Sequence, residues 1–141
     1  MIRPSRASEI DDIMTLWLNA NRQAHDFVPE EYWLSHYDEV KTEIAKGVFV
    51  YEQNERIAGF IGLIEKYIAG LFVRTDKRRA GIGRALIEFC KKQSPILELH
   101  VFEKNTGAVS FYEKNGFKKI HICPAEEIPE NEIFMRWEKL S

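Results

Sequence analysis

The segment at residues 74–86, RTDKRRAGIGRAL, places two glycines and five basic residues at the start of a predicted helix. A turn of this kind exposes main-chain N–H groups without partners, and the positive end of the helix dipole adds to them. Gly81 and Gly83 leave room beside those N–H groups, and the arginines can add charge-assisted contacts. The residues therefore predict an anion site that fits a pyrophosphate, with a solvated basic turn as the equal alternative.

Two well-known phosphate-binding loops do not match this segment. A Walker loop needs Lys and then Ser or Thr after its second glycine, whereas Arg84 and Ala85 follow Gly83. A dinucleotide-binding turn needs a third glycine where Leu86 stands, and its strand begins a parallel β-α-β unit. The strand before this loop instead ends a predicted antiparallel series, so both nucleotide-binding classes are excluded.

The elements that position the loop follow from the spacing of the apolar residues. Helical spacing predicts helices at residues 10–18, 29–46, 82–90 and 106–115. Strands are predicted at residues 1–5, 48–52, 57–65, 67–73, 96–102, 117–122 and 133–137. The order β-α-α-β-β-β-α-β-α-β-β indicates a mixed α+β fold with a mostly antiparallel central sheet.

Length and composition limit the classes of function. The chain has 141 residues, 45% of them hydrophobic, so one domain over residues 1–141 is expected. With 22 acidic and 20 basic residues, it lacks the positive excess typical of nucleic-acid binding. No apolar run is long enough to cross a bilayer or to serve as a signal peptide, which predicts a cytoplasmic protein without membrane contact. Cys90 and Cys123 lack CxxC spacing, so reduced thiols and no metal are expected.

A second motif, NTGAVSFYEKNGF at residues 105–117, lies one predicted strand and one helix after the loop. Together, R-x-x-G-x-G and N-x-x-A-x-x-F-Y-x-x-x-G-F resemble the acetyl-coenzyme A-binding motifs of the GNAT superfamily of N-acetyltransferases. The predicted order of elements is that of the GNAT fold, so the resemblance covers nearly the whole chain. The run NRQAHDFVPEEYW at residues 21–33 is similar to small bacterial acetyltransferases, some of which acetylate protein lysines.

The resemblance implies a site for acetyl-coenzyme A (acetyl-CoA) along the strand at residues 67–73 and the loop after it. In the family this strand splays from its neighbour at a bulge, here allowed by Gly70, and its main chain pairs with the pantetheine arm. The loop would bind the pyrophosphate and Asn105 the arm, although Asn105 is also a good N-cap. The implied cofactor-binding residues are Leu71, Phe72, Val73, Arg78, Arg79, Ala80, Gly81, Ile82, Gly83, Arg84 and Asn105.

The same resemblance makes Tyr112 the candidate general acid, because it matches the tyrosine close to the thioester sulfur in many GNAT enzymes. A phenol with a pKa of about 10 can supply a proton to a thiolate whose pKa is about 8.5. The alternative is a half-buried aromatic residue on a helix face.

The general base and the acceptor pocket are predicted from residues near the splay and the first interhelical linker. Glu65, which ends the strand at residues 57–65, is the candidate base, with an exposed turn carboxylate as the equal alternative. His25 would line the acceptor pocket, with Phe27 and Trp33 nearby as walls of the cleft, or else the segment would cap the next helix or pack the linker. A water chain is the other route for the proton.

The resemblance implies direct transfer of acetyl from acetyl-CoA to a primary amine, without a metal or a covalent enzyme intermediate. The acceptor is open between a protein lysine and a small amine such as a polyamine, an amino acid or an antibiotic. A non-catalytic coenzyme A-binding module is the alternative of another class. The protein is expected to be a monomer or a homodimer.

Overall fold

The computed structural model describes residues 1–74 and 81–140. The strands are β1 (Ile2–Pro4), β2 (Phe49–Gln53), β3 (Arg56–Ile64), β4 (Tyr67–Val73), β5 (Ile96–Phe102), β6 (Lys118–Pro124) and β7 (Asn131–Glu138). The helices are η1 (Ala7–Glu9), α1 (Ile10–Ala24), α2 (Glu30–Ser35), α3 (Tyr37–Ala45), α4 (Ile82–Lys91) and α5 (Thr106–Lys114). The predicted order is confirmed, except that the helix expected at residues 29–46 is two helices that meet at His36.

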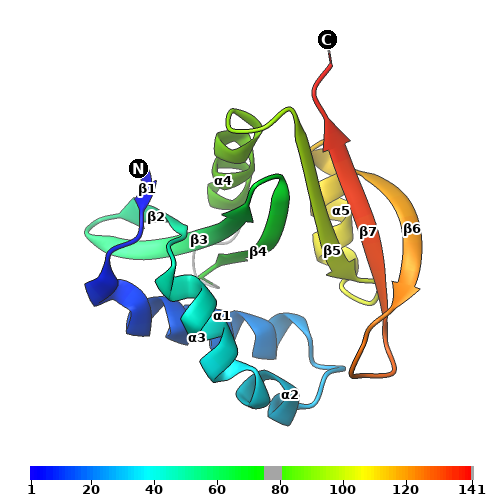
Figure 1. Ribbon diagram of the computed structural model, residues 1–141, viewed down its shortest axis with the longest axis horizontal. Coiled ribbons are helices and arrows are strands. Elements are labelled where there is room, and N and C mark those ends of the chain that lie inside the picture. Colours follow the sequence, from blue (N-terminus) through cyan, green and yellow to red (C-terminus); the bar gives the residue numbers. More distant parts are fainter. Residues whose placement is uncertain (75–80, 141) are drawn as a thin grey trace.

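The strands form one mixed sheet in the order β1-β2-β3-β4-β5-β7-β6 (Figure 1). Each neighbouring pair is antiparallel apart from β4 and β5, which run parallel. The prediction of a mostly antiparallel sheet is therefore confirmed. Helices cover both faces of this sheet.

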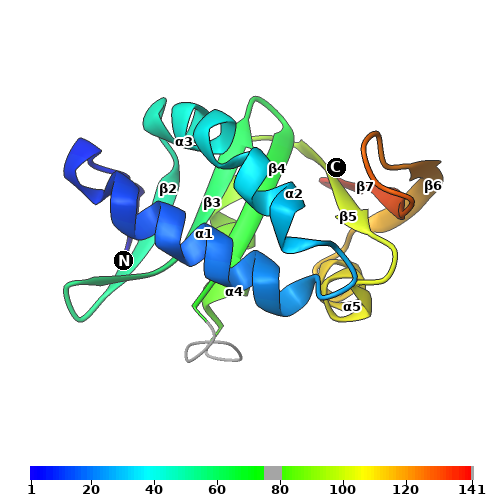
Figure 2. The ribbon, with the colours of Figure 1, turned by 90° about the horizontal axis from the view of Figure 1, so that it is seen from below.

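Strands β4 and β5 separate soon after they meet. Their pairing is limited to Tyr67 and Glu98, next to a hydrogen bond from Glu98 N to Lys66 O of 2.9 Å. The register between β3 and β4 shifts so that Ala69 has no partner in β3, which makes it the extra residue of a bulge. The predicted splay and bulge are present, and both views show the two strands diverging toward their carboxyl ends (Figures 1 and 2).

The β3–β4 ladder decides which main-chain groups of β4 face this opening. Arg74 N donates to Ala58 O at 2.8 Å, and Phe72 pairs with Phe60 two residues further along the ladder. Because hydrogen-bonded and non-hydrogen-bonded pairs alternate in an antiparallel ladder, Phe72 directs its main-chain groups toward β3. Leu71 and Val73 direct theirs toward β5, where the splay leaves that edge open.

Two apolar cores hold the sheet between its helices. Helices α1, α2 and α3 pack on one face around Met14, Trp17 and Phe60. Helices α4 and α5 pack on the other face around Leu86 and Leu97 (Figure 2). Since each core crosses several elements, the splayed strands and the helix ends beside them are held in fixed positions. Among the described residues, no helix has the length and apolarity needed to cross a membrane.

Candidate active site

A pocket of about 760 Å³ lies where β4 and β5 separate. It is lined by Ala20, Asn21, Ala24, His25, Leu71, Phe72, Val73, Gly81, Ile82, Gly83, Arg84, Asn105, Gly107, Ala108, Ser110, Phe111, Tyr112 and Lys114. The pocket thus brings together the end of β4, the start of α4, helix α5 and the end of α1. Every predicted cofactor-binding residue lines it apart from Arg78, Arg79 and Ala80, which lie outside the described residues.

The amino end of α4 directs main-chain N–H groups toward this pocket. The first hydrogen bond within the helix runs from Ala85 N to Gly81 O at 3.0 Å, and among residues 1–74 and 81–140 no side chain caps the helix. The N–H groups of residues 81–84 therefore have no partner within the helix, which is the arrangement that binds phosphate groups. Gly81 has φ of +81°, a conformation that side-chain-bearing residues rarely adopt, so glycine is required there by the backbone.

Gly83 has a different role from the one expected of it. A Cβ atom on Gly83 would lie 3.1 Å from Cζ of Phe111 and 3.4 Å from Cε1 of the same ring. Glycine at this position therefore allows α4 to approach α5 closely. The sequence predicts that Gly83 leaves room for a phosphate, whereas in the structure a Cβ atom on Gly83 would point toward the Phe111 ring.

We expect Gly83→Val to lower the free energy of unfolding by about 1–3 kcal/mol through overpacking against Phe111. Gly107→Val is the control, because a Cβ at this other glycine meets nothing within 4 Å. Urea denaturation should also show part of the loss restored in the double variant with Phe111→Leu. Equal losses in Gly83→Val and Gly107→Val would contradict the packing role.

Tyr112 lies in the pocket wall with 8% of its surface exposed. Its ring packs edge-on against Phe111 and Phe117, with centroid distances of 5.4 and 5.6 Å. Burial raises the pKa of Tyr112 well above the ordinary value of a phenol. The hydroxyl is thus protonated at neutral pH and can act as a hydrogen donor.

Asn105 joins the pocket to the linker after α1. Its Oδ1 accepts a hydrogen bond from Ala108 N at 3.2 Å, so it is the N-cap of α5. Its Nδ2 lies 3.0 Å from Nε2 of His25. The opposite ring nitrogen, Nδ1, lies 3.1 Å from Oδ1 of Asn21, a buried residue that sequence reasoning missed. The sequence does carry a signal for Asn21, because it is a polar residue on the apolar face of α1, four positions before His25.

Of the three residues predicted for the acceptor pocket, His25 alone lines the pocket described above. Its ring stacks on Trp33 at 5.4 Å and packs edge-on against Phe27 at 5.7 Å. Phe102, which sequence reasoning treated only as a strand residue, completes this aromatic cluster at 5.1 Å. Phe27 and Trp33 therefore hold His25 in place through ring contacts.

The predicted position of Glu65 beside the open part of the splay is wrong. Glu65 is exposed in the turn between β3 and β4, with φ of +57°, and does not line the pocket. The turn adjoins Tyr67, where β4 still pairs with β5, whereas the pocket lies at the other end of β4. A hairpin reverses direction, so the end of β3 lies beside the start of β4 and away from the opening. Among the described residues that line the pocket, none is a carboxylate.

The buried imidazole gives a pH-dependent stability that can be measured. Burial lowers the pKa of His25 to about 4, compared with about 6.5 in an unfolded chain. The unfolded state therefore binds more protons between these values, and the free energy of unfolding should fall as pH drops through this window. We expect a loss on the order of 1 kcal/mol from pH 7.5 to 5.0, measured by urea denaturation. His25→Gln should lose less over the same range, and an equal loss would contradict this assignment.

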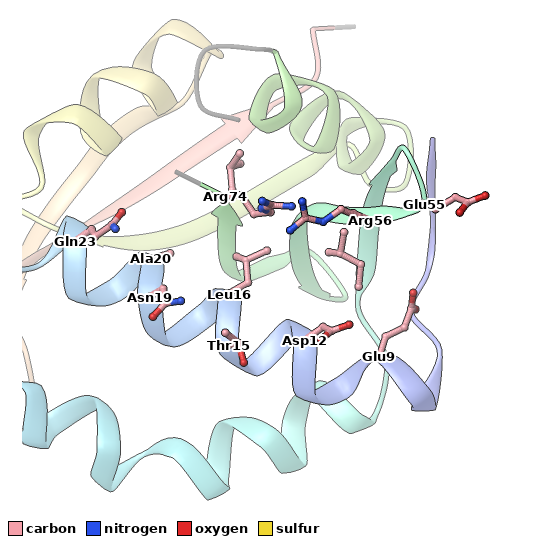
Figure 3. A pocket seen from close by; sticks show the side chains of 12 residues that line it. Glu9, Asp12, Thr15, Leu16, Asn19, Ala20, Gln23, Glu55, Arg56 and Arg74 are labelled. Carbon is pink, nitrogen blue, oxygen red and sulfur yellow. The ribbon is translucent and has the colours of Figure 1, made fainter. Parts of the chain in front are cut away.

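A second pocket of about 590 Å³ lies beside the other half of α1 (Figure 3). Figure 3 shows the Arg56 and Arg74 side chains turned toward one another, whereas the Glu55 side chain points away from them. Because three carboxylates, those of Glu9, Asp12 and Glu55, also line this pocket, a pyrophosphate would meet charges of both signs there. The pocket at the splay is therefore the candidate active site.

Comparisons with known proteins identify the family of this chain. Residues 45–119 match the family model of the GNAT acetyltransferase domain. The chain is 30% identical over 140 residues to the peptidyl-lysine N-acetyltransferase YiaC of Escherichia coli K12, covering 97% of this chain and 96% of YiaC. It is 34% identical over 119 residues to the peptidyl-lysine N-acetyltransferase YjaB of the same organism, covering 83% and 81%.

Solved structures share the fold. The solution structure of apo-form YjaB from Escherichia coli matches with a TM-score of 0.88 at 28% identity, over 99% of this chain and 98% of that one. A GNAT-family acetyltransferase from Bacillus cereus matches with a TM-score of 0.74 at 18% identity, over 100% and 99% of the two chains. The chain therefore belongs to the GNAT family of acetyltransferases and is an acyltransferase enzyme.

Proposed function

We propose that this enzyme transfers the acetyl group of acetyl-CoA to the side-chain amine of a protein lysine, by direct attack in a ternary complex. The observation that carries the proposal is the pocket at the splay, which combines the open edge of β4, the uncapped amino end of α4, Asn105 and Tyr112. The similarity to YiaC and YjaB, which are named peptidyl-lysine N-acetyltransferases, supports lysine as the acceptor.

Two parts of acetyl-CoA, the pantetheine arm and the pyrophosphate, have matching surfaces in the pocket. The amide groups of the pantetheine arm pair with the main chain of Leu71 and Val73, as an added strand would. The pyrophosphate binds the N–H groups at the amino end of α4, with Arg84 adding positive charge. Phe72 also lines the pocket, but its main chain is directed toward β3 and does not pair with the arm.

The reaction needs a neutral amine. A lysine amine has a pKa of about 10.4, so its neutral form costs about 4.6 kcal/mol at pH 7. The described lining residues offer no carboxylate, and both nitrogens of His25 are already hydrogen-bonded. We therefore assign removal of the amine proton to water rather than to Glu65.

Tyr112 acts on the leaving group. The amine nitrogen forms a bond to the carbonyl carbon, and the carbon–sulfur bond then breaks to release coenzyme A as a thiolate. The hydroxyl of Tyr112 donates a hydrogen bond to the departing sulfur and supplies its proton, and solvent reprotonates the phenol. Because burial makes a phenolate costly, the hydrogen bond to sulfur rather than a lasting phenolate gives the stabilisation.

The test measures thiol release from acetyl-CoA with a panel of amines, and mass spectrometry then locates the acetyl group. The panel contains a lysine peptide with a blocked amino terminus, the same peptide with Lys replaced by Arg and a free amino terminus, and a polyamine. We expect turnover with the blocked lysine peptide and a mass increase on its lysine. Turnover with the polyamine alone would overturn the acceptor assignment. Coenzyme A binding without turnover on any amine would overturn the enzymatic role.

A further inference from the structure

A directed chain of hydrogen bonds runs from α1 to the amino end of α5. Asn21 Nδ2 donates to Trp17 O at 3.0 Å, and Asn21 Oδ1 lies 3.1 Å from His25 Nδ1. His25 Nε2 lies 3.0 Å from Asn105 Nδ2, and Asn105 Oδ1 accepts from Ala108 N at 3.2 Å. The chain begins at a main-chain carbonyl, which can only accept, and ends at a main-chain N–H, which can only donate.

These two ends determine which atom donates and which accepts in every hydrogen bond between them. Since Asn21 gives its amide hydrogen to a carbonyl, its oxygen must accept, and His25 must carry a hydrogen on Nδ1. The neutral ring then has an unprotonated Nε2, which accepts from Asn105 Nδ2. Asn105 is left with its oxygen toward Ala108 N, as observed. If the Asn105 amide were rotated by half a turn, its oxygen would face the lone pair of His25 Nε2 and its NH₂ group would face the N–H of Ala108. Both contacts would then be repulsive.

We propose that His25 is a positioning residue that fixes the amide of Asn105 for the pantetheine arm of acetyl-CoA, through this chain from Asn21. The proposal rests on the proposed function. Asn105 keeps one hydrogen on Nδ2 and one lone pair on Oδ1, and the fixed orientation presents them to an amide of the arm. His25 thus acts through Asn105 on cofactor affinity and has no part as the base for the acceptor amine.

The surroundings of His25 fit this role. Trp33 stacks on the ring and Phe102 packs on its edge, so the imidazole has little freedom to turn. Burial among these rings also keeps the imidazole neutral at physiological pH. A neutral ring with one fixed tautomer can hold a neighbouring amide in one orientation, whereas a charged ring would donate from both nitrogens.

The test is a double-mutant cycle read by calorimetric titration with coenzyme A. We expect His25→Phe and Asn105→Ala each to weaken binding roughly 10-fold, since each removes one hydrogen-bonding contribution. The double variant should bind about as weakly as Asn105→Ala alone, because both changes act through one amide. His25→Gln, whose side-chain oxygen can still accept from Asn105, should recover most of the affinity. His121→Phe, an exposed histidine outside the pocket, is the control and should bind like the parent protein.

Two outcomes would overturn the positioning role. One is a double variant whose loss multiplies to roughly 100-fold, as independent residues would give. The other is nitrogen-15 NMR of the parent protein at pH 7 that shows the His25 hydrogen on Nε2 instead of Nδ1, a readout that needs no variant to fold. Failure of the parent protein to bind coenzyme A would overturn the proposed function instead, so the two failures are distinguishable.

Discussion

Tyr112→Phe should lower kcat for acetyl transfer about 100-fold while leaving the KM for acetyl-CoA nearly unchanged. The substitution removes only the hydroxyl that meets the departing sulfur, and the ring keeps its contacts with Phe111 and Phe117. Among the described residues, no hydrogen bond to the Tyr112 hydroxyl is present to be lost. The stability of the variant should therefore stay within about 1 kcal/mol of the parent protein.

Steady-state thiol release with the blocked lysine peptide provides the measurement. Tyr51→Phe is the matched control, because Tyr51 packs against the same core cluster but does not line the pocket. A variant of Tyr112 with the kcat of the parent protein would remove it from the chemistry. A large rise in KM with kcat unchanged would instead place its contribution in cofactor binding.

Gly81→Val should raise the KM for acetyl-CoA roughly 10- to 100-fold, because it disturbs the charge-assisted hydrogen bonds at the amino end of α4. Gly81 has φ of +81°, so a branched side chain also costs about 1–3 kcal/mol of stability. A side chain there would alter the direction of the N–H groups of residues 81–84, which have no partner within the helix.

Gly47→Val separates the two effects of this substitution. Gly47 also has positive φ, +115°, with open space around its Cβ position, but it lies after α3 and does not line the pocket. Both variants should denature at lower urea concentration, and only Gly81→Val should lose affinity for the cofactor. A similar KM in both variants would contradict the placement of the pyrophosphate at α4.

Periodicity was sufficient to predict the elements and their order, because most of them bury one apolar face; β6, which has no buried residue, is an exception. It did not predict the break at His36, where neither glycine nor proline interrupts the pattern. The structure joins His36 Nε2 to Glu127 at 2.7 Å, a contact between residues 91 positions apart. Such tertiary contacts leave no local trace in the sequence.

The two motifs predicted where the pocket lies, but they did not predict the role of each residue within it. Main-chain contacts were expected from Leu71, Phe72 and Val73 alike, and only the register with β3 separates Phe72 from the other two. Glu65 was misplaced because a strand pattern does not tell at which end of a hairpin the sheet opens. The link from His25 to Asn105 spans 80 positions, so no spacing rule predicts it.

Amide hydrogen exchange of β4 and α4, with and without coenzyme A, tests the central claim most directly. The amides of Leu71 and Val73 should gain protection on binding, as should those of residues 82–84. Phe72 should be protected in both states, since its N–H is directed to β3. Coenzyme A binding that leaves Leu71, Val73 and the amino end of α4 exchanging as before would contradict the assignment of this splay as the cofactor site.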